Sequence, residues 1–195
     1  MKPILSYPLN SPVITQVFGA NSQFYSDPKF GGIIGHNGID FKSYLGQPIY
    51  ATHDGIASYQ VDNSQGHGVV IISKDNTFKT IYWHLCNPEK YPQFQSPIAN
   101  KGFVSVNNGD LIGYADNTGA STGTHLHFGL KMVAQGENNW TWYNLNQNNG
   151  YLGAIDPLPY FDYSTPFQIE LMKKQISLLT KVVELSKKLL GLLST

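Results

Sequence analysis

The sequence predicts a mainly β fold, built from antiparallel sheet with long loops, followed by one amphipathic α-helix at the C-terminal end. Up to about residue 165, short apolar or alternating runs are separated by Gly, Asn, Asp and Pro, which is typical of antiparallel strands and their turns. No stretch in that part keeps a helical apolar period for four turns, as a helix packed on a core would. The 195 residues suffice for one domain with a core and a short appendage.

The predicted strands follow these runs in chain order. They are residues 13–18, 48–51, 55–59, 69–72, 78–83, 111–114 and 125–130. Asp75 and Asn76 lie between the fourth and the fifth run, where they suit the turn of a hairpin. Long loops are expected chiefly at residues 20–35, 86–102 and 134–155.

The pattern changes at residue 167. From there to residue 190 the chain has no Gly or Pro, and apolar residues recur at helical spacing in two neighbouring stripes, with Lys and Glu on the remaining face. Residues 164–166, Ser-Thr-Pro, supply a cap and a proline start. We therefore expect two domains, at residues 1–165 and 166–195, of which the second is an amphipathic helix.

The apolar face of the helix at 167–195 must be buried against its own domain, a second copy of the chain or a membrane surface. The segment carries five Lys and two Glu, an excess that suits an anionic surface. Lysines on a helix are nevertheless usually its solvated side. We therefore favour docking or homo-oligomer formation over membrane-surface contact.

The charge and cysteine content exclude several classes of protein. The 13 Lys and Arg residues balance 13 Asp and Glu, and every cation is Lys, so no nucleic-acid partner is expected. The single cysteine, Cys86, excludes an internal disulfide and a cysteine-based zinc cluster, and we expect it to be buried. The first residues lack the apolar segment of a signal peptide, and no apolar run is long enough to span a bilayer. We therefore expect a chain made in the cytoplasm.

Three short patterns contain histidine. His36 and Asp40 belong to His-Asn-Gly-Ile-Asp, His84 to Tyr-Trp-His-Leu, and His125 and His127 to His-Leu-His. Each is weak evidence alone, because a chance His-x-His is common in a chain with six histidines. The first pattern is also consistent with a polar loop, and the last with strand residues whose rings only form hydrogen bonds. Side chains at i and i+2 of a strand share a face, so His125 and His127 can converge on one object.

Together the patterns fit a metal site. Zinc takes imidazole nitrogen and carboxylate oxygen, and a catalytic zinc site uses three protein ligands with a fourth position left for water. One Asp and two His leave the bound ion with a net positive charge, which polarises a carbonyl and lowers the pKa of the bound water. A hydrolase also needs groups that move protons and stabilise an oxyanion. His84 and His125 are available for those roles.

The patterns resemble the lysostaphin-type zinc endopeptidases of peptidoglycan. That family shows H-x-G-x-D, then Y-x-H-L, then G-N-T-G-x-S-T-G-x-H-L-H-F. This chain has corresponding stretches, in the same order, at residues 36–40, 82–85 and 116–128. Shorter stretches around them also agree, so the resemblance covers roughly residues 10–163.

The resemblance implies a zinc ion held by His36, Asp40 and His127, with His84 and His125 as the catalytic pair. It also implies an antiparallel β fold with a groove, walled by loops, in which the wall peptide lies. The expected reaction is attack of a metal-activated water on a peptide carbonyl of bacterial peptidoglycan, in a cross-bridge or a stem peptide. One of the paired histidines would act as base and the other as donor to the oxyanion, in an order that the resemblance leaves open.

Two departures from the family leave the groove width, and therefore the bond that is cut, open. They are a long insertion at residues 86–102 and a Gly-Gly-containing loop before His36. Some relatives have lost metal ligands, so a non-hydrolytic wall-binding or structural module of a phage particle is the alternative. The complete set of five polar residues favours the enzyme. A phage-encoded endolysin or a virion-associated enzyme is the expected setting, and export from a free-living bacterium by another route is the alternative.

The remaining histidines and aromatic residues receive simpler interpretations. His53 and His67 are expected at the surface or in loops, and His67 has a smaller chance of lining the groove. Core or rim packing is favoured over substrate contact for a further set of aromatic residues. They are Trp83, Trp140, Trp142 and Tyr143.

Overall fold

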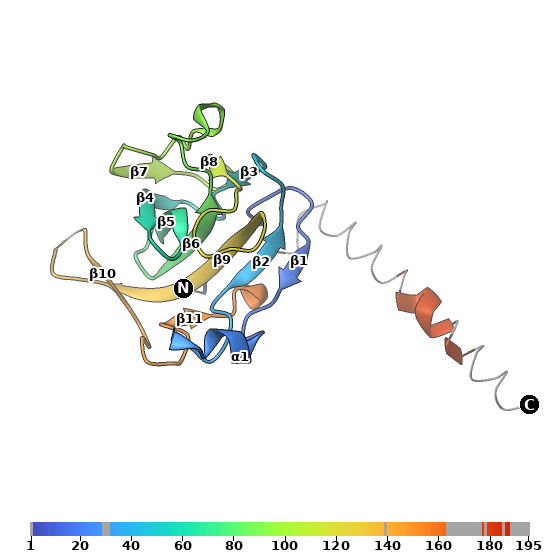
Figure 1. Cartoon of the computed structure of the whole chain (residues 1–195). Helices are drawn as coiled ribbons and strands as arrows, with labels where there is room; N and C mark the ends of the chain where they lie inside the picture. The colour runs from blue at the N-terminus through green and yellow to red at the C-terminus, as the bar shows by residue number, and fades with distance from the viewer. Residues whose placement is uncertain are drawn as a thin grey trace, which may run out of the picture. The chain divides into compact units, whose positions relative to one another are not determined.

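A computed structural model of the chain describes residues 2–28, 32–138, 140–162, 177, 179–184 and 186–187. They belong to two compact units, residues 1–161 and 162–195. The strands of the described residues all lie in the first unit, and Figure 1 shows them curving around one another in an antiparallel arrangement. The predicted mainly β antiparallel fold is confirmed.

A curved central sheet forms most of the first unit. Its main path runs in the spatial order β1 (Ile14–Gln16), β2 (Ile39–Lys42), β9 (His125–Gln135), β6 (Phe78–Leu85), β5 (Gly66–Ser73), β4 (Gly55–Asp62) and β7 (Phe103–Val106). Two short strands, β10 (Trp142–Asn144) and β11 (Ala154–Ile155), also pair with β9. A second sheet consists of β3 (Pro48–Tyr50) and β8 (Leu111–Tyr114). The short helical elements are α1 (Ser22–Tyr25), η2 (Pro92–Phe94) and η3 (Leu158–Tyr160).

One face of the central sheet is packed on the core. Along β9, Leu126, Phe128 and Leu130 are completely buried, and they join a cluster that includes Ile49 of β3 and Ile112 of β8. The residues between them in the sequence point to the opposite face, since side chains alternate along a strand. The alternation at 125–130 therefore directs His125 and His127 away from the core.

The predicted strand runs all fall on strands of the structure, namely β1, β3, β4, β5, β6, β8 and β9. The structure adds β2, β7, β10 and β11, which are too short to show a period of their own. Residues 134–155 were expected as loop, and this is partly wrong. β9 continues to Gln135 because β10 pairs with it, and β11 begins inside the same range. Asn76, with φ 58°, forms part of the predicted turn between β5 and β6.

Cys86 is buried, as expected. The expectation for His53 is wrong in one respect, because this loop residue is only 7% exposed. Its Nε2 lies 2.9 Å from the Thr80 hydroxyl and its Nδ1 lies 2.8 Å from the Asp54 carbonyl. These polar partners allow an imidazole to lie in the interior, where burial lowers its pKa. His67 lies on β5 and is partly buried, with Nδ1 2.9 Å from the Tyr59 hydroxyl.

The second unit is described only in part. Residues 177, 179–184 and 186–187 are helical, and their side chains are exposed. The other residues of the helix predicted at 167–195, and its cap at 164–166, lie outside the described residues. Within the described part of the chain, no helix combines the length and the apolarity that crossing a bilayer requires.

Candidate metal centre

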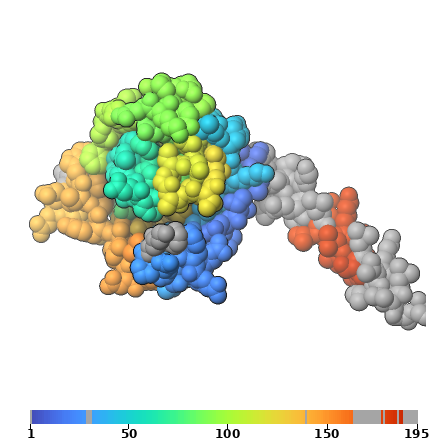
Figure 2. Space-filling view, in the orientation of Figure 1, coloured from blue at the N-terminus to red at the C-terminus, as the bar shows by residue number. Residues whose placement is uncertain are grey.

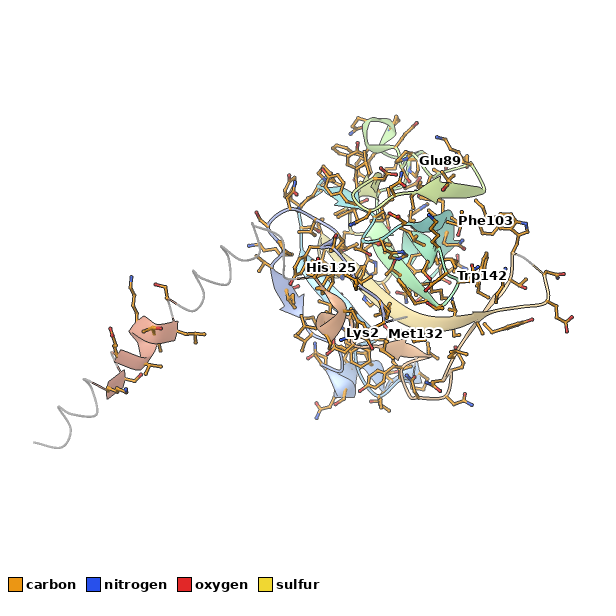
Figure 3. All side chains as sticks on the ribbon, turned by 180° about the vertical axis from the view of Figure 1, so that it is seen from behind. Lys2, Glu89, Phe103, His125, Met132 and Trp142 are labelled. Atoms are coloured by element: carbon orange, nitrogen blue, oxygen red, sulfur yellow. The ribbon has the colours of Figure 1, made fainter. Side chains whose placement is uncertain are left out.

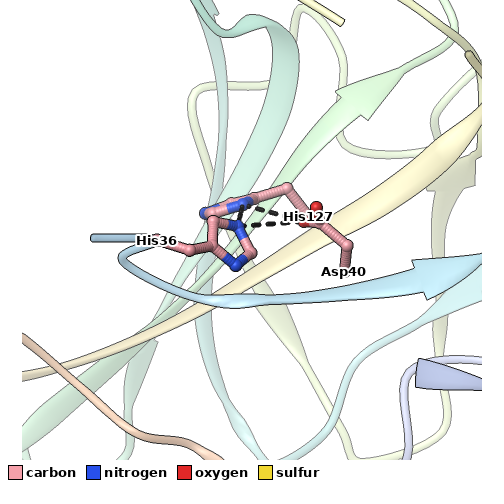
Figure 4. A group of neighbouring side chains, drawn as sticks. All are labelled: His36, Asp40 and His127. Atoms are coloured by element: carbon pink, nitrogen blue, oxygen red, sulfur yellow. Dashed lines mark hydrogen bonds and ion pairs between the residues drawn. The ribbon is translucent and has the colours of Figure 1, made fainter. Parts of the chain in front are cut away.

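The first pair of the predicted site is brought together by strand register. Asp40 of β2 lies directly opposite His127 of β9 in an antiparallel ladder, so their side chains share a face. His36 comes from the loop before β2, four residues ahead of Asp40, and reaches the same point. Figure 4 shows the three side chains directed at one another above β2 and β9.

The donor atoms of these residues form a tight triangle. His36 Nε2 lies 2.9 Å from His127 Nδ1 and 3.1 Å from Asp40 Oδ1, and Asp40 Oδ1 lies 3.2 Å from His127 Nδ1. Zinc–nitrogen and zinc–oxygen bonds are about 2.0–2.2 Å long, so atoms that share one zinc ion are separated by about 3.0–3.5 Å. The spacing and the chemistry of the three donors therefore fit a zinc ion.

Hydrogen bonds alone account poorly for this triangle. His36 Nδ1 lies 3.3 Å from the Val17 carbonyl oxygen, which can only accept, so His36 carries its proton there and turns the lone pair of Nε2 inward. Of the three donor atoms, only His127 Nδ1 can then carry a proton, and it faces both His36 Nε2 and Asp40 Oδ1. A shared cation would satisfy all three lone pairs at once. An outer carbonyl that orients a ligating imidazole is typical of metal sites.

The protonation states also suit a metal. His36, Asp40 and His127 are buried, and none of them is more than 8% exposed. Burial opposes ionisation of Asp40, but the neighbouring imidazoles of His127 and His36 outweigh it and hold the pKa of this carboxyl well below its usual range. Burial lowers the pKa of His127, which keeps its imidazole neutral. A carboxylate and neutral imidazoles are the forms that bind a metal ion.

Gly38 lets His127 reach its position. A Cβ atom on Gly38 would lie 2.6 Å from the Phe128 carbonyl oxygen and 2.7 Å from His127 Cε1. Real Cβ atoms essentially never come within 3.0 Å of such neighbours. The middle glycine of His-Asn-Gly-Ile-Asp is therefore required by the close approach of the segment just before β2 to the ring of His127.

The second predicted pair lies beside this triangle. The rings of His84 and His125 are 4.6 Å apart, and His125 Nε2 is 3.7 Å from Asp40 Oδ1. His84 Nδ1 donates to the Thr118 carbonyl at 2.7 Å and His125 Nδ1 to the Gly123 carbonyl at 2.8 Å. Each Nδ1 therefore carries a proton, and in the neutral imidazole each Nε2 has a lone pair. All five predicted site residues are thus brought together, and the rings of His36, His84 and His125 are each oriented by a backbone carbonyl.

His84 is held in an unusual state. Its backbone has φ 65°, a left-handed conformation that non-glycine residues seldom adopt and that tends to occur at functional sites. Burial, and after it the neighbouring imidazoles of His125 and His127, lowers the pKa of His84 to about 4. His84 is therefore neutral at physiological pH.

The five residues line a cavity of about 310 Å³. Its other walls come from α1, from the end of the β4–β5 hairpin and from the loop before β9, which meet on one face of the molecule in Figure 2. Tyr25 of α1 lies in this wall, with its ring stacked on His36 at 5.4 Å and its hydroxyl accepting from Gln16 Nε2 at 2.9 Å. The sequence motifs contain no signal for Tyr25, because it lies in a loop with no recurring pattern.

The family model of "Peptidase family M23" matches residues 34–139. This chain is also similar to the peptidoglycan DD-endopeptidase ShyA of Vibrio cholerae, with 36% identity over 95 residues that cover 49% of the chain and 20% of ShyA. It is 30% identical to an uncharacterized metalloprotease of Haemophilus influenzae over 129 residues, which cover 65% of the chain and 24% of that protein. The chain thus spans a fifth to a quarter of the length of these curated relatives.

Solved structures agree in fold. A zinc-containing peptidase from Vibrio cholerae has a TM-score of 0.52 and 28% identity, over 73% of this chain and 39% of that one. LytU has a TM-score of 0.53 and 27% identity, over 78% and 86% of the two chains. The catalytic domain of lysostaphin from Staphylococcus simulans, with a TM-score of 0.50 and 23% identity over 82% and 90%, supports the fold alone.

An antiparallel sheet that carries a buried His–Asp–His triangle next to two further histidines defines a site of the metallopeptidase class. The chain belongs to peptidase family M23, since the family model covers more than half of its 195 residues. The resemblance to lysostaphin-type enzymes is confirmed by this match and by the similar structures.

Proposed function

We propose that this protein is a zinc-dependent endopeptidase that cuts a peptide bond in bacterial peptidoglycan. The observation that carries the proposal is the convergence of donor atoms from His36, Asp40 and His127, at 2.9–3.2 Å from one another, on the wall of an accessible cavity. The peptidoglycan substrate is supported by the name of the relative ShyA, a peptidoglycan DD-endopeptidase.

His36, Asp40 and His127 would hold the zinc ion. Bound there, zinc supplies a Lewis acid that polarises a carbonyl and lowers the pKa of water. One carboxylate and two neutral imidazoles leave one positive charge uncompensated, which favours an oxyanion in the cavity. The Val17 carbonyl keeps His36 in the tautomer that this role requires.

His84 and His125 would move the proton. Each has Nδ1 tied to a backbone carbonyl, so each offers a fixed Nε2 lone pair to the cavity. One of the two can take a proton from the attacking water and return it to the leaving amine, and the other, when it carries a proton on Nε2, can donate to the oxyanion. The Tyr25 hydroxyl, whose pKa is raised by burial, accepts from Gln16 and keeps its own proton for an acceptor in the cavity.

The proposal is tested with purified walls. A chelator should abolish the release of new amino termini, and zinc should restore it. His127→Ala should lose zinc and activity together. His67→Ala, which removes a histidine of β5 outside the triangle, is the matched control and should keep its zinc. Mass spectrometry of the released fragments identifies the bond that is cut.

One outcome contradicts the hydrolytic part of the proposal. If the wild type binds zinc stoichiometrically but releases no new amino termini from a panel of chemically different walls, the chain is a non-hydrolytic wall-binding module. If it binds no zinc at any pH above the range in which the histidines titrate, the assignment of the metal centre is wrong.

A further inference from the structure

Three aromatic residues form an exposed cluster far from the metal centre, called here the aromatic corner. Phe103 belongs to β7, Trp140 lies in the loop between β9 and β10, and Trp142 is the first residue of β10. The rings of Phe103 and Trp140 stack at 4.8 Å and 25°, and Trp142 lies 6.2 Å from Phe103. Figure 3 shows Phe103 and Trp142 near each other and well away from His125.

The fold itself needs only part of this corner. Trp142 is partly buried and donates from Nε1 to Asn76 Oδ1 at 3.0 Å, which fastens the hairpin to the β5–β6 turn. Phe103 and Trp140 remain 48% and 58% exposed. Stacking covers one face of each ring, so exposure of about one half leaves the other face open. Clustered exposed aromatic rings usually mark a binding surface.

The cavity beside the aromatic corner has both polar and apolar groups in its lining. It measures about 380 Å³, and Trp140 and Trp142 form its aromatic wall. The rest of the lining includes apolar side chains, Ile56 and Val106, and also carboxylate, hydroxyl and amide groups, among them those of Asp54, Ser105, Asn107 and Gln135. Flat aromatic faces next to such groups suit a pyranose ring, whose C–H face stacks on the rings while its hydroxyls form hydrogen bonds.

Strand register places the aromatic corner on the same face of the sheet as the metal centre. Phe103 pairs with Ser58, Ser58 with Val70, Val70 with Ile81, and Ile81 with Gly129. Directly paired residues share a face, and Gly129 is two residues from His127 on β9, so Phe103 and His127 share a face. Four strand spacings, about 19 Å across the sheet, separate β7 from β9. Trp142 pairs with Gln135, which is eight residues, or about 26 Å, along β9 from His127. An extended peptide of about six to eight residues spans such distances.

We propose that the aromatic corner is a saccharide-binding subsite that holds the glycan strand of the wall polymer while the metal centre cuts a peptide attached to it. The identity of the polymer rests on the proposed function, since peptidoglycan consists of glycan strands joined by short peptides. Binding of a sugar at the corner is independent of cleavage and can be measured without it.

The first experiment titrates the full chain with a soluble tetramer of N-acetylglucosamine. The indole N–H signals of Trp140 and Trp142 should shift in ¹H–¹⁵N spectra, while that of Trp83, which packs on Gly68, should not. Phe103→Ala combined with Trp140→Ala should abolish the shift of Trp142. Tyr143→Ala is the matched control, because Tyr143 is also exposed on β10 but alternates to the other face. Absence of any tryptophan shift at millimolar tetramer would overturn the proposal.

The second experiment measures the kinetic constants of the same variants on two substrates. On intact walls, the double variant should raise KM by about fivefold to tenfold, while kcat/KM on a short glycan-free peptide stays within about twofold of wild type. An equal loss on both substrates, or an equal loss in Tyr143→Ala, would overturn the subsite. Failure of the wild type to cut either substrate would refute the proposed function and leave the titration result standing.

Discussion

Replacing Gly38 by alanine tests whether the close approach of the Gly38 backbone to β9 fixes the position of His127 in the candidate metal centre. The new Cβ would lie 2.6 Å from the Phe128 carbonyl oxygen, 2.7 Å from His127 Cε1 and 2.8 Å from His127 Nε2. Ordinary contact begins at 3.4 Å, so these neighbours must withdraw by about 0.6–0.8 Å. The carbonyl belongs to a central strand and cannot move alone, so the segment that carries residue 38 and the ring of His127 both have to give way.

A displacement of that size exceeds what a metal site tolerates. Metal–ligand distances have to stay within about 0.2 Å of their preferred values. We therefore expect Gly38→Ala to weaken zinc binding by about tenfold to a hundredfold, the range found when the support of a ligand is removed. Overpacking should also lower the free energy of unfolding of the metal-free protein by about 1–3 kcal/mol.

Zinc affinity is measured by competition with a chromogenic chelator, and stability by urea unfolding with excess chelator. Gly129→Ala is the matched control, because it lies on β9 two residues from His127 and its Cβ would meet only ordinary contacts at 3.5–3.8 Å. If Gly38→Ala binds zinc as tightly as Gly129→Ala does, the position of His127 is not set by this close approach and the reasoning is wrong.

Three further predictions concern pH, charge and the C-terminal segment. The pKa of His84 is lowered to about 4 in the folded protein by burial and neighbouring imidazoles. Between that pKa and the pKa of about 6.5 in the unfolded chain, the unfolded chain binds more protons, so the stability of the folded protein falls as pH drops from 7 to 5. His84→Gln should reduce that loss by about 1–2 kcal/mol in urea unfolding of metal-free protein, and an unchanged loss contradicts the prediction. Lys79 lies directly opposite Lys131, and burial followed by Lys79 lowers the pKa of Lys131 to about 8. Lys79→Met should therefore stabilise the protein at pH 7 by about 0.2–1 kcal/mol, with a gain that shrinks above pH 8 as Lys131 loses its charge. If helix 167–195 mediates self-association, light scattering should give a mass above that of a monomer for the full chain and a monomer mass for residues 1–165. A monomer mass for the full chain rules out self-association.

Much of the fold could be predicted from local patterns. The runs that became β4, β5, β6 and β9 alternate or are strongly apolar, and those strands lie at the centre of the sheet, where burial enforces the pattern. The strands that escaped prediction are short. β2 and β11 exist because β9 offers them a backbone to pair with, and such long-range pairing leaves no period in the local sequence.

The sequence by itself determined the family and singled out the five polar residues that the structure brings to one cavity, because their motifs keep fixed spacings around residues with narrow roles. Only the tertiary structure decided that Asp40 lies opposite His127, that His36 meets a histidine 91 positions later, and that Tyr25 joins their cavity. The physical reason is register. A shift of one residue between β2 and β9 would turn Asp40 to the core and separate the donor atoms, and that register is selected by the packing of the whole sheet.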